Sequence, residues 1–540
     1  MLSLFTTWAF CLRAKQGWRR YAAAFVYGAL AGLAFPPFNA VPLLWLSFPA
    51  LVFLLQGISK ADVMPAKAGI PFSVSLPDKK INGTPAFAGV TVRAFAVGWS
   101  FSFGLLVVSL YWIAGALFVD IKQFWWAVPL AVAGLPAVFA VYYGVAALIA
   151  KLWGLERLDG LLVLALAWFL ADYGRGHLMT GFPWDVTGYV WGDVLPVMQI
   201  ASVIGIYGLT LLTLVLAVLP ARKSALALLA AVMMLFVAIA GWGAWRLSQA
   251  SNEIVPDVRL RLVQPNVSQA NKWRAEKRES QFQQLLENSF APSSNPPTAI
   301  IWPETATGFY LAEDPEHLKA IAARMTLGQS VITGVVYRGI NANGTLSFYN
   351  SLIAIDDQAR ITAGYDKFHL VPFGEYMPFR SILPIHAVAA ISDFTPGEGP
   401  KTLRVAGLLP FSPLVCYEAI FPDEVIDGDD PQFMLNVTND AWYEHTTGPA
   451  QHFIIARTRA VEEGMPLVRV ANKGVTAVVD AYGRIAARAS FDKAEFVDSN
   501  LPRALQEFTL FRRFHDWPLW ALCGLLLALA GLLRVRARKR

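Results

Sequence analysis

The chain has 540 residues, of which 55% are hydrophobic and only 16% are charged, and its formal net charge is +6. Soluble globular proteins usually carry about 25% charged residues, so this composition excludes a wholly soluble enzyme and a disordered chain and favours a polytopic membrane protein. Part of the positive charge is a cluster of five basic residues at 534–540. Such a cluster after an apolar run indicates membrane topology rather than nucleic-acid binding.

Apolar runs close to the length of a membrane-spanning helix lie on both sides of a long polar stretch. We predict eight transmembrane helices, at residues 21–38, 41–57, 94–118, 124–150, 160–172, 195–219, 224–247 and 516–533. Residues 1–247 would form a transmembrane bundle, and residues 511–540 the final helix with its basic tail. Residues 58–92 are rich in Pro, Gly and Lys, so we expect a flexible cytoplasmic insertion without a catalytic role.

The basic end of the chain sets the expected orientation. Moving an arginine or lysine to the centre of a bilayer costs roughly 2.5–3.5 kcal/mol on insertion scales. The basic cluster after the last helix should therefore stay in the cytoplasm, which places residues 248–510 on the outer side. With eight helices, both termini are expected in the cytoplasm.

Between residues 248 and 510, strand-like and helix-like patterns alternate, as is typical of a layered α/β domain. Val258, Leu260 and Leu262 alternate with charged residues, which predicts a half-buried strand. Further strands are predicted at 299–302, 330–337, 350–355, 408–416 and 433–437, and helices at 272–289, 315–325 and 449–463. The predicted fold is therefore a membrane α-helical bundle with one extracytoplasmic α/β domain.

Three residues suited to acyl transfer stand at or near the ends of predicted strands. Glu304 follows the 299–302 segment, Cys416 ends the 408–416 segment, and Lys367 precedes an apolar run. A free thiol has a pKa of about 8.5, a carboxylate can accept its proton, and an ammonium can stabilise the resulting anion or a tetrahedral oxyanion. This chemistry needs no metal or nucleotide, so we expect no cofactor.

Spacing alone leaves these three residues as candidates. A single cysteine after a strand is most often a small core residue, and a single glutamate or lysine is most often a cap or a surface charge. The sequence lacks a G-x-S-x-G elbow, an H-E-x-x-H pair, a Walker A loop and a dinucleotide fingerprint. These absences argue against a serine hydrolase, a metalloenzyme and an NTPase.

The local sequence around the three residues resembles the nitrilase superfamily, whose signature is a Glu-Lys-Cys triad in an α-β-β-α sandwich. With membrane helices on both sides, nearly the whole chain except 58–92 resembles the bacterial apolipoprotein N-acyltransferase family. The motifs that carry the resemblance are Thr180–Trp184, Gln264–Asn266, Lys272–Trp273, Trp302–Glu304, Lys367–Tyr376, Cys416–Glu418 and Asn439–Trp442.

The resemblance implies a role for each matched residue. Glu304 would be the general base, Lys367 would stabilise anions, and Cys416 would be the nucleophile. Four further residues would support catalysis or bind substrate: Glu375, Tyr417, Glu418 and Trp273.

The implied reaction moves an acyl chain from a membrane phospholipid to Cys416 as a thioester. The chain then passes to the α-amine of the diacylglyceryl-modified N-terminal cysteine of an apolipoprotein. The resemblance implies a bacterial inner-membrane enzyme with a periplasmic catalytic domain, and nothing in the sequence demands more than a monomer. The apolar segment 377–394, next to Glu375, is expected to be a mobile lid that dips into lipid.

Two other functions stay open at this point. A membrane-tethered amidase or nitrile-type hydrolase would use the same triad, with water instead of an amine to discharge the thioester. A transporter or receptor would use the outer domain only for binding. Charges inside the membrane helices would be expected for it, and the sequence has few, with Asp172 and Arg175 at a helix edge.

Overall fold

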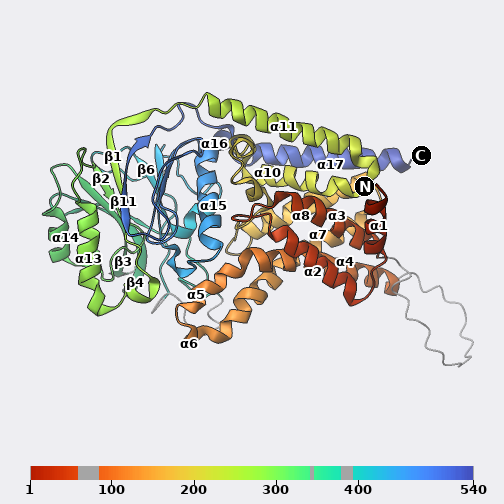
Figure 1. The fold of residues 1–540 in the computed structure, drawn as a ribbon, viewed down its shortest axis with the longest axis horizontal. Coiled ribbons are helices and arrows are strands. Elements are labelled where there is room, and N and C mark those ends of the chain that lie inside the picture. Colours follow the sequence, from red (N-terminus) through yellow and green to blue (C-terminus); the bar gives the residue numbers. More distant parts are fainter. Residues whose placement is uncertain (1, 59–83, 341–343, 345, 379–392, 539–540) are drawn as a thin grey trace, which may run out of the picture.

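The computed structural model describes residues 2–58, 84–340, 344, 346–378 and 393–538. Most of the predicted insertion (59–83) and most of the predicted lid (379–392) lie outside the described residues. A bundle of helices occupies one side of the molecule, and a domain that contains all the described strands occupies the other (Figure 1).

The longer helices of the bundle follow the apolar runs of the sequence. Their bounds are α1 (Leu2–Arg13), α2 (Trp18–Gly32), α3 (Leu44–Gln56), α4 (Thr84–Leu110), α7 (Leu135–Trp153), α8 (Leu158–His177), α10 (Ala201–Val218), α11 (Leu226–Ser248) and α17 (Trp517–Arg538). Shorter helices are α5 (Gly115–Phe118), α6 (Ile121–Phe124), α9 (Leu195–Met198) and α16 (Leu510–Phe514). The last part of the predicted insertion, from Thr84, belongs to α4.

Five stretches of the described chain are long and apolar enough to cross a membrane. They are Gly89–Phe118, Ile121–Trp153, Ala201–Ala221, Lys223–Ser248 and Trp517–Arg538, with Val41–Gln56 as a shorter apolar helix. The eight-helix count stays a prediction. Because α8 carries Asp159, Asp172 and Arg175, its composition is more polar than that of these five stretches.

The predicted helix at 195–219 is divided into two parts. It forms α9 and α10, and Gly205 inside α10 has a φ of 65°, which a helix cannot continue through. The backbone N–H of Ile206, which this break leaves without a helical partner, donates to the carboxylate of Glu462 at 2.7 Å. The backbone N–H that this kink leaves unpaired within the helix is therefore hydrogen-bonded by a side chain from the α/β domain.

Two sheets form the centre of the α/β domain. The first has six strands in the order β11 (Glu495–Pro502), β1 (Ile254–Gln264), β2 (Ala299–Ile301), β3 (Ser330–Ile340), β4 (Leu346–Asp356) and β5 (Ile361–Asp366). The second has five strands in the order β10 (Ile485–Arg488), β9 (Ala477–Val479), β8 (Leu467–Ala471), β7 (Phe433–Thr438) and β6 (Phe411–Val415). Strands were predicted at β1–β4, β6 and β7.

Apolar side chains define the order of the layers. Between the sheets, Leu262 and Leu352 of the first pack in one core with Val415 and Val437 of the second. The outer face of the first sheet is covered by α13 (Ala275–Ser289) and α14 (Pro315–Ala322). The second sheet packs against α15 (Gly448–Glu463), which also contacts the bundle. The domain is thus an α-β-β-α sandwich whose last layer touches the membrane helices (Figure 1).

Candidate active site

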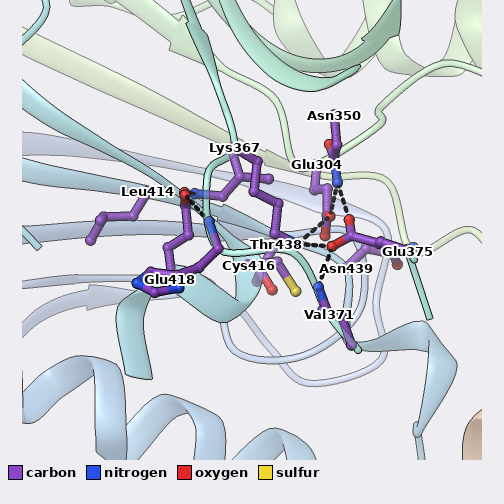
Figure 2. A network of polar contacts seen from close by, with 12 residues as sticks. Glu304, Asn350, Lys367, Val371, Glu375, Leu414, Cys416, Glu418, Thr438 and Asn439 are labelled. Carbon is purple, nitrogen blue, oxygen red and sulfur yellow. Dashed lines mark hydrogen bonds and ion pairs between the residues drawn. The ribbon is translucent and has the colours of Figure 1, made fainter. Parts of the chain in front are cut away.

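The predicted catalytic residues lie at the same edge of the two sheets. Glu304 follows β2, Lys367 follows β5, and Cys416 follows β6. Strands β2 and β3 are parallel, and β5 runs in the same direction because it is separated from β3 by one antiparallel strand. Their carboxyl ends therefore meet at one edge, and the three side chains converge with Glu375 in one network (Figure 2).

A chain of short polar contacts joins the two carboxylates to the lysine. Nζ of Lys367 lies 2.8 Å from Oε2 of Glu375 and 4.0 Å from Oε1 of Glu304. Nδ2 of Asn350, on β4, donates to both carboxylates, at 2.8 Å to Glu304 and 2.7 Å to Glu375. The backbone N–H of Val371 donates to Glu375 at 2.8 Å. Each carboxylate is thereby held in one orientation.

Burial and charge set the protonation of this network. Burial, with a contribution from the Glu375 charge, raises the pKa of Glu304, although Lys367 opposes the shift. Burial opposes the charge on Lys367, but Glu375 and Glu304 outweigh it and raise the pKa of the ammonium. At neutral pH the site therefore holds a charged lysine beside a carboxylate that accepts protons more readily than a solvated one.

The thiol of Cys416 rests in its protonated form. Burial and the neighbouring Glu304 carboxylate raise the pKa of the thiol, and Lys367 lowers it only in part. Attack by the sulfur therefore requires a base that removes the proton as the new bond forms. Glu304 is suited to this task because its charge is felt directly at the thiol.

The backbone of Cys416 adopts a conformation that is unusual for a residue with a side chain. Its φ is 54°, and it begins a short 3-10 helix, η10 (Cys416–Ile420). A non-glycine residue in the left-handed region costs about 1–3 kcal/mol and persists only where its surroundings fix it. The turn places the thiol at the first position after a buried strand, in the same way as the nucleophile of a strand-to-helix elbow.

Glu418 fixes this turn from within the protein. Its side chain is fully buried; Oε2 accepts from the backbone N–H of Val415 at 2.7 Å, and Oε1 accepts from the hydroxyl of Tyr365 at 2.7 Å and the N–H of Phe368 at 2.8 Å. These bonds connect the end of β6 to the segment that carries Lys367. Glu418 therefore positions the lysine and the cysteine relative to each other.

Tyr417 connects the site to the membrane bundle. Its hydroxyl donates to the backbone oxygen of Gly181 at 3.2 Å, and its ring lies 6.4 Å from that of Phe182. The same loop is held from α8, because Arg175 donates to the carbonyls of Phe182 at 2.9 Å and Trp184 at 2.6 Å. The cysteine turn is thus anchored against the loop that follows α8 in the bundle.

The side chain of Trp273, another predicted residue, lies outside the polar network. It follows the short helix α12 (Gln269–Lys272) and is 41% exposed. Its neighbour Lys272 is buried, and its Nζ donates to the backbone oxygen of Glu304 at 3.2 Å. Burial lowers the pKa of Lys272 to about 8, against the raising effect of Glu304 and Cys416.

Sequence reasoning missed the roles of Lys272 and Asn350. Lys272 was part of a matched motif, and Asn350 was a polar residue at the start of a predicted apolar strand. Both positions were visible as exceptions to the local pattern. Their contacts with Glu304 follow from the pairing of distant segments, which no local pattern contains.

Comparison with known proteins finds two family models in the chain. Residues 85–219 match the apolipoprotein N-acyltransferase N-terminal domain, and residues 259–507 match the carbon-nitrogen hydrolase family. The apolipoprotein N-acyltransferase of Brucella suis is 40% identical over 509 residues, covering 91% of this chain and 92% of its own. That of Rhodopseudomonas palustris is 37% identical over 543 residues, covering 96% of each chain.

Solved structures match the α/β part at lower similarity. A CN-hydrolase superfamily protein of Xanthomonas campestris is 20% identical, with a TM-score of 0.34, and the match covers 46% of this chain and 91% of that one. An amidase of Nesterenkonia is 18% identical, with a TM-score of 0.34, over 50% of this chain and 99% of that one.

Proposed function

The chain belongs to the apolipoprotein N-acyltransferase family, and we propose that the Cys416 thiol carries the acyl group between its two substrates. As a member of this family, the protein is a bacterial membrane enzyme that N-acylates lipoproteins. The observation that carries the proposal is the convergence of Glu304, Lys367 and Cys416 at one sheet edge, beside a loop of the membrane bundle.

In the first half-reaction, Sγ of Cys416 attacks the ester carbonyl carbon of a membrane phospholipid while Glu304 takes the thiol proton. The ammonium of Lys367, with backbone N–H groups, stabilises the oxyanion of the tetrahedral intermediate. When the intermediate collapses, the ester C–O bond breaks. The leaving alkoxide takes the proton from Glu304, which releases a lysophospholipid and leaves a thioester on Cys416.

In the second half-reaction, the α-amine of the diacylglyceryl-modified N-terminal cysteine of an apolipoprotein attacks the thioester. Glu304 accepts a proton from the amine and returns it to the departing sulfur of Cys416. The product is an N-acylated lipoprotein. An amide is a weaker acyl donor than a thioester, so this step runs downhill.

The lipid substrates explain why the catalytic domain is attached to membrane helices. Each buried CH₂ group contributes about 0.8 kcal/mol, so extraction of a diacyl lipid into water is prohibitive. Tyr417, next to the thiol, contacts the Gly181 loop between α8 and α10. The site is therefore at the junction where a chain still seated in the bilayer can meet the sulfur.

We place residues 248–510 in the periplasm and residues 1–247 in a transmembrane bundle that holds seven of the eight predicted helices. Residues 511–540 supply the eighth helix and its basic tail. Arg534, Arg536 and Arg538 lie in the last part of α17, and a cluster of this kind favours the cytoplasmic side. Arg222 and Lys223 before α11, against Arg246 near its end, agree with this orientation.

The test is the mass of the purified protein after incubation with phospholipid. We expect one added acyl chain on Cys416 that hydroxylamine removes, and no such adduct in Cys416→Ser. Cys523→Ser is the matched control, because Cys523 is another free cysteine, buried on α17. This variant should be acylated like the unaltered protein.

Addition of a diacylated lipopeptide separates the transferase from the hydrolase. Transfer consumes the adduct and gives an amide-linked acyl chain on the peptide. If water discharges the thioester equally fast with and without the lipopeptide, and free fatty acid is the product, then the proposed acceptor is wrong.

A further inference from the structure

A buried polar cluster lies behind the nucleophile and takes no part in the reaction described above. It contains His452 on α15, Asp440 in the short helix η11 (Asp440–Trp442) and Arg469 on β8. Nδ1 of His452 is 2.9 Å from Oδ1 of Asp440 and 3.0 Å from Nη2 of Arg469. Nη2 of Arg469 is also 3.0 Å from Oδ2 of Asp440. All three side chains are essentially inaccessible to solvent.

The other ring nitrogen of His452 points at the backbone of the nucleophile. Nε2 lies 3.2 Å from the carbonyl oxygen of Cys416. A carbonyl oxygen can only accept, so Nε2 carries a hydrogen. Burial and the charge of Arg469 lower the pKa of His452.

Asp440 and its neighbours hold the opposite edge of the His452 ring. Arg469 and His452 outweigh burial and hold the pKa of Asp440 at about 2, so the carboxylate is charged. The hydroxyl of Tyr443 donates to Oδ1 of Asp440 at 2.9 Å, and that of Thr438 donates to the same oxygen at 3.1 Å. Nδ1 of His452 lies 2.9 Å from the same carboxylate oxygen, 3.0 Å from Nη2 of Arg469 and 3.2 Å from the Tyr443 hydroxyl. These three neighbours hold the ring in the orientation that directs Nε2 to Cys416.

The bond to the carbonyl has a consequence for the next peptide N–H. A trans peptide is planar, so the Cys416 carbonyl and the Tyr417 N–H point in opposite directions. His452 holds this carbonyl at 3.2 Å, with a longer contact from Nδ2 of Asn436 at 3.4 Å. Because the carbonyl is fixed on this side, the Tyr417 N–H is directed to the other side. This N–H belongs to the first turn of η10 and has no acceptor within that helix. The Tyr417 N–H comes one residue after the cysteine that carries the sulfur. The oxyanion forms on the carbon that this sulfur attacks, so a hydrogen-bond donor is required close to the sulfur.

We propose that His452 is a positioning residue for acyl transfer: by donating to the Cys416 carbonyl, it fixes the Cys416–Tyr417 peptide so that the Tyr417 N–H faces the developing oxyanion. His452 touches no reacting atom. The inference rests on the proposed role of Cys416 as the nucleophile. It gives a function to Asp440, which belongs to a matched motif that the reaction itself does not use.

Packing from the membrane side supports the same arrangement. The ring of Trp184, from the loop after α8, lies 5.2 Å from the ring of His452. Its Nε1 donates to the side chain of Gln451 at 2.9 Å, one residue before the histidine. The histidine is therefore wedged between the bundle loop and the nucleophile turn, and its ring has little freedom to leave the carbonyl.

Two substitutions separate the two nitrogens of the ring. In His452→Gln, the side-chain amide nitrogen can take the place of Nε2 and donate to Cys416. In His452→Asn, the shorter amide reaches only the Nδ1 position, beside Asp440 and Arg469. We expect His452→Asn to slow thioester formation by about 10²-fold, the usual cost of one lost oxyanion donor. We expect His452→Gln to retain most of the rate.

A second readout distinguishes positioning from general damage to the site. Alkylation of Cys416 by iodoacetamide is a direct displacement that forms no oxyanion, so its rate should be unchanged in both variants. Thr458→Val, at a buried position on the same helix, is the control and should change neither rate.

Equal losses of acylation in the two variants, or a parallel fall in alkylation, would overturn the positioning role while leaving Cys416 as the nucleophile. Absence of any thioester in the unaltered protein would overturn the proposed function and this inference with it.

Discussion

The ammonium of Lys367 lies 2.8 Å from a carboxylate oxygen of Glu375 but 4.0 Å from the nearest oxygen of Glu304. The lysine therefore forms its ion pair with Glu375, and Glu304 is the less neutralised of the two carboxylates. The two carboxylates therefore have different roles in the proposed mechanism. In the proposed mechanism, Glu375 orients the lysine and Glu304 exchanges a proton with the thiol.

Removal of the base should stop the first half-reaction. In Glu304→Gln, the amide keeps the size of the side chain but cannot accept the thiol proton. We expect thioester formation to fall by about 10²- to 10⁴-fold, the range typical of a general base, measured as the rate of mass increase with phospholipid. Glu287→Gln, on the exposed side of α13, should acylate normally. An unchanged rate in Glu304→Gln would assign the base elsewhere.

The pH dependence of acylation should report the charge of Glu375. The negative charge of Glu375 raises the pKa of Glu304, so Glu375→Gln should lower it. Because acylation requires ionised Glu304, the acid limb of the pH–rate profile should move to lower pH, and the plateau should fall as the base weakens. Initial rates of thioester formation across the acid range test this. A limb that moves to higher pH would contradict the assignment.

Replacement of the Glu418 carboxylate by an amide should destabilise the protein through the loss of a hydrogen-bond acceptor. In Glu418→Gln, an amide nitrogen replaces one oxygen and faces a donor, either the Val415 N–H or the Tyr365 and Phe368 pair. A lost bond to a buried charged group costs about 1.5–3 kcal/mol, so the unfolding temperature in detergent should fall. Thermal unfolding of the purified protein measures this, and the exposed Glu287→Gln is the reference. An equal unfolding temperature in both variants would refute the positioning role of Glu418.

Two substitutions at Tyr417 should differ in effect. Tyr417→Phe removes the 3.2 Å bond to Gly181 and should cost only about 0.5–1.5 kcal/mol of stability, with turnover nearly preserved. Tyr417→Ala also removes the ring contacts with Phe182 and Phe421 and should reduce lipid turnover strongly. Turnover in proteoliposomes, measured as kcat and KM for phospholipid, compares them. Equal losses would mean that the hydroxyl, not the ring, connects the site to the bundle.

The local sequence context was sufficient to select some of the candidate site residues. Glu304 and Cys416 stand at the ends of apolar strand segments, and the structure brings the two side chains close together. Their catalytic roles stay predictions. Asn350 and His452 were not singled out, because one lies on a strand and the other within a helix. Their contacts arise when β4 pairs with its neighbours and when α15 packs on the second sheet. Those pairings are non-local, so no window of sequence contains them.

In the membrane part, hydropathy locates apolar helices but does not predict their breaks or their buried polar residues. Apolar runs located α10, but the break at Gly205 depends on a positive φ and on Glu462, which comes from a segment 256 residues later in the chain than Ile206. Likewise, α8 forms a 20-residue helix although it carries Asp172 and Arg175. These two form an ion pair with each other at 3.4 Å within the bundle. Hydrogen-bond and ion-pair partners in the folded protein make these polar groups tolerable inside the bundle. A hydropathy profile contains no information about such partners.

Helix α15 belongs to two cores at once. Phe453, Ala456 and Ala460 pack on the second sheet, while Ile454, Ile455 and Val461 pack with the bundle. Separating the α/β domain from the bundle would thus expose the apolar residues of α15 on the domain. It would also expose the apolar residues of the bundle that pack against them. Because one helix serves both cores, the catalytic domain is attached to the bundle by packing as well as by the chain. In the proposed reaction, the lipid substrates must therefore reach it by diffusion within the bilayer.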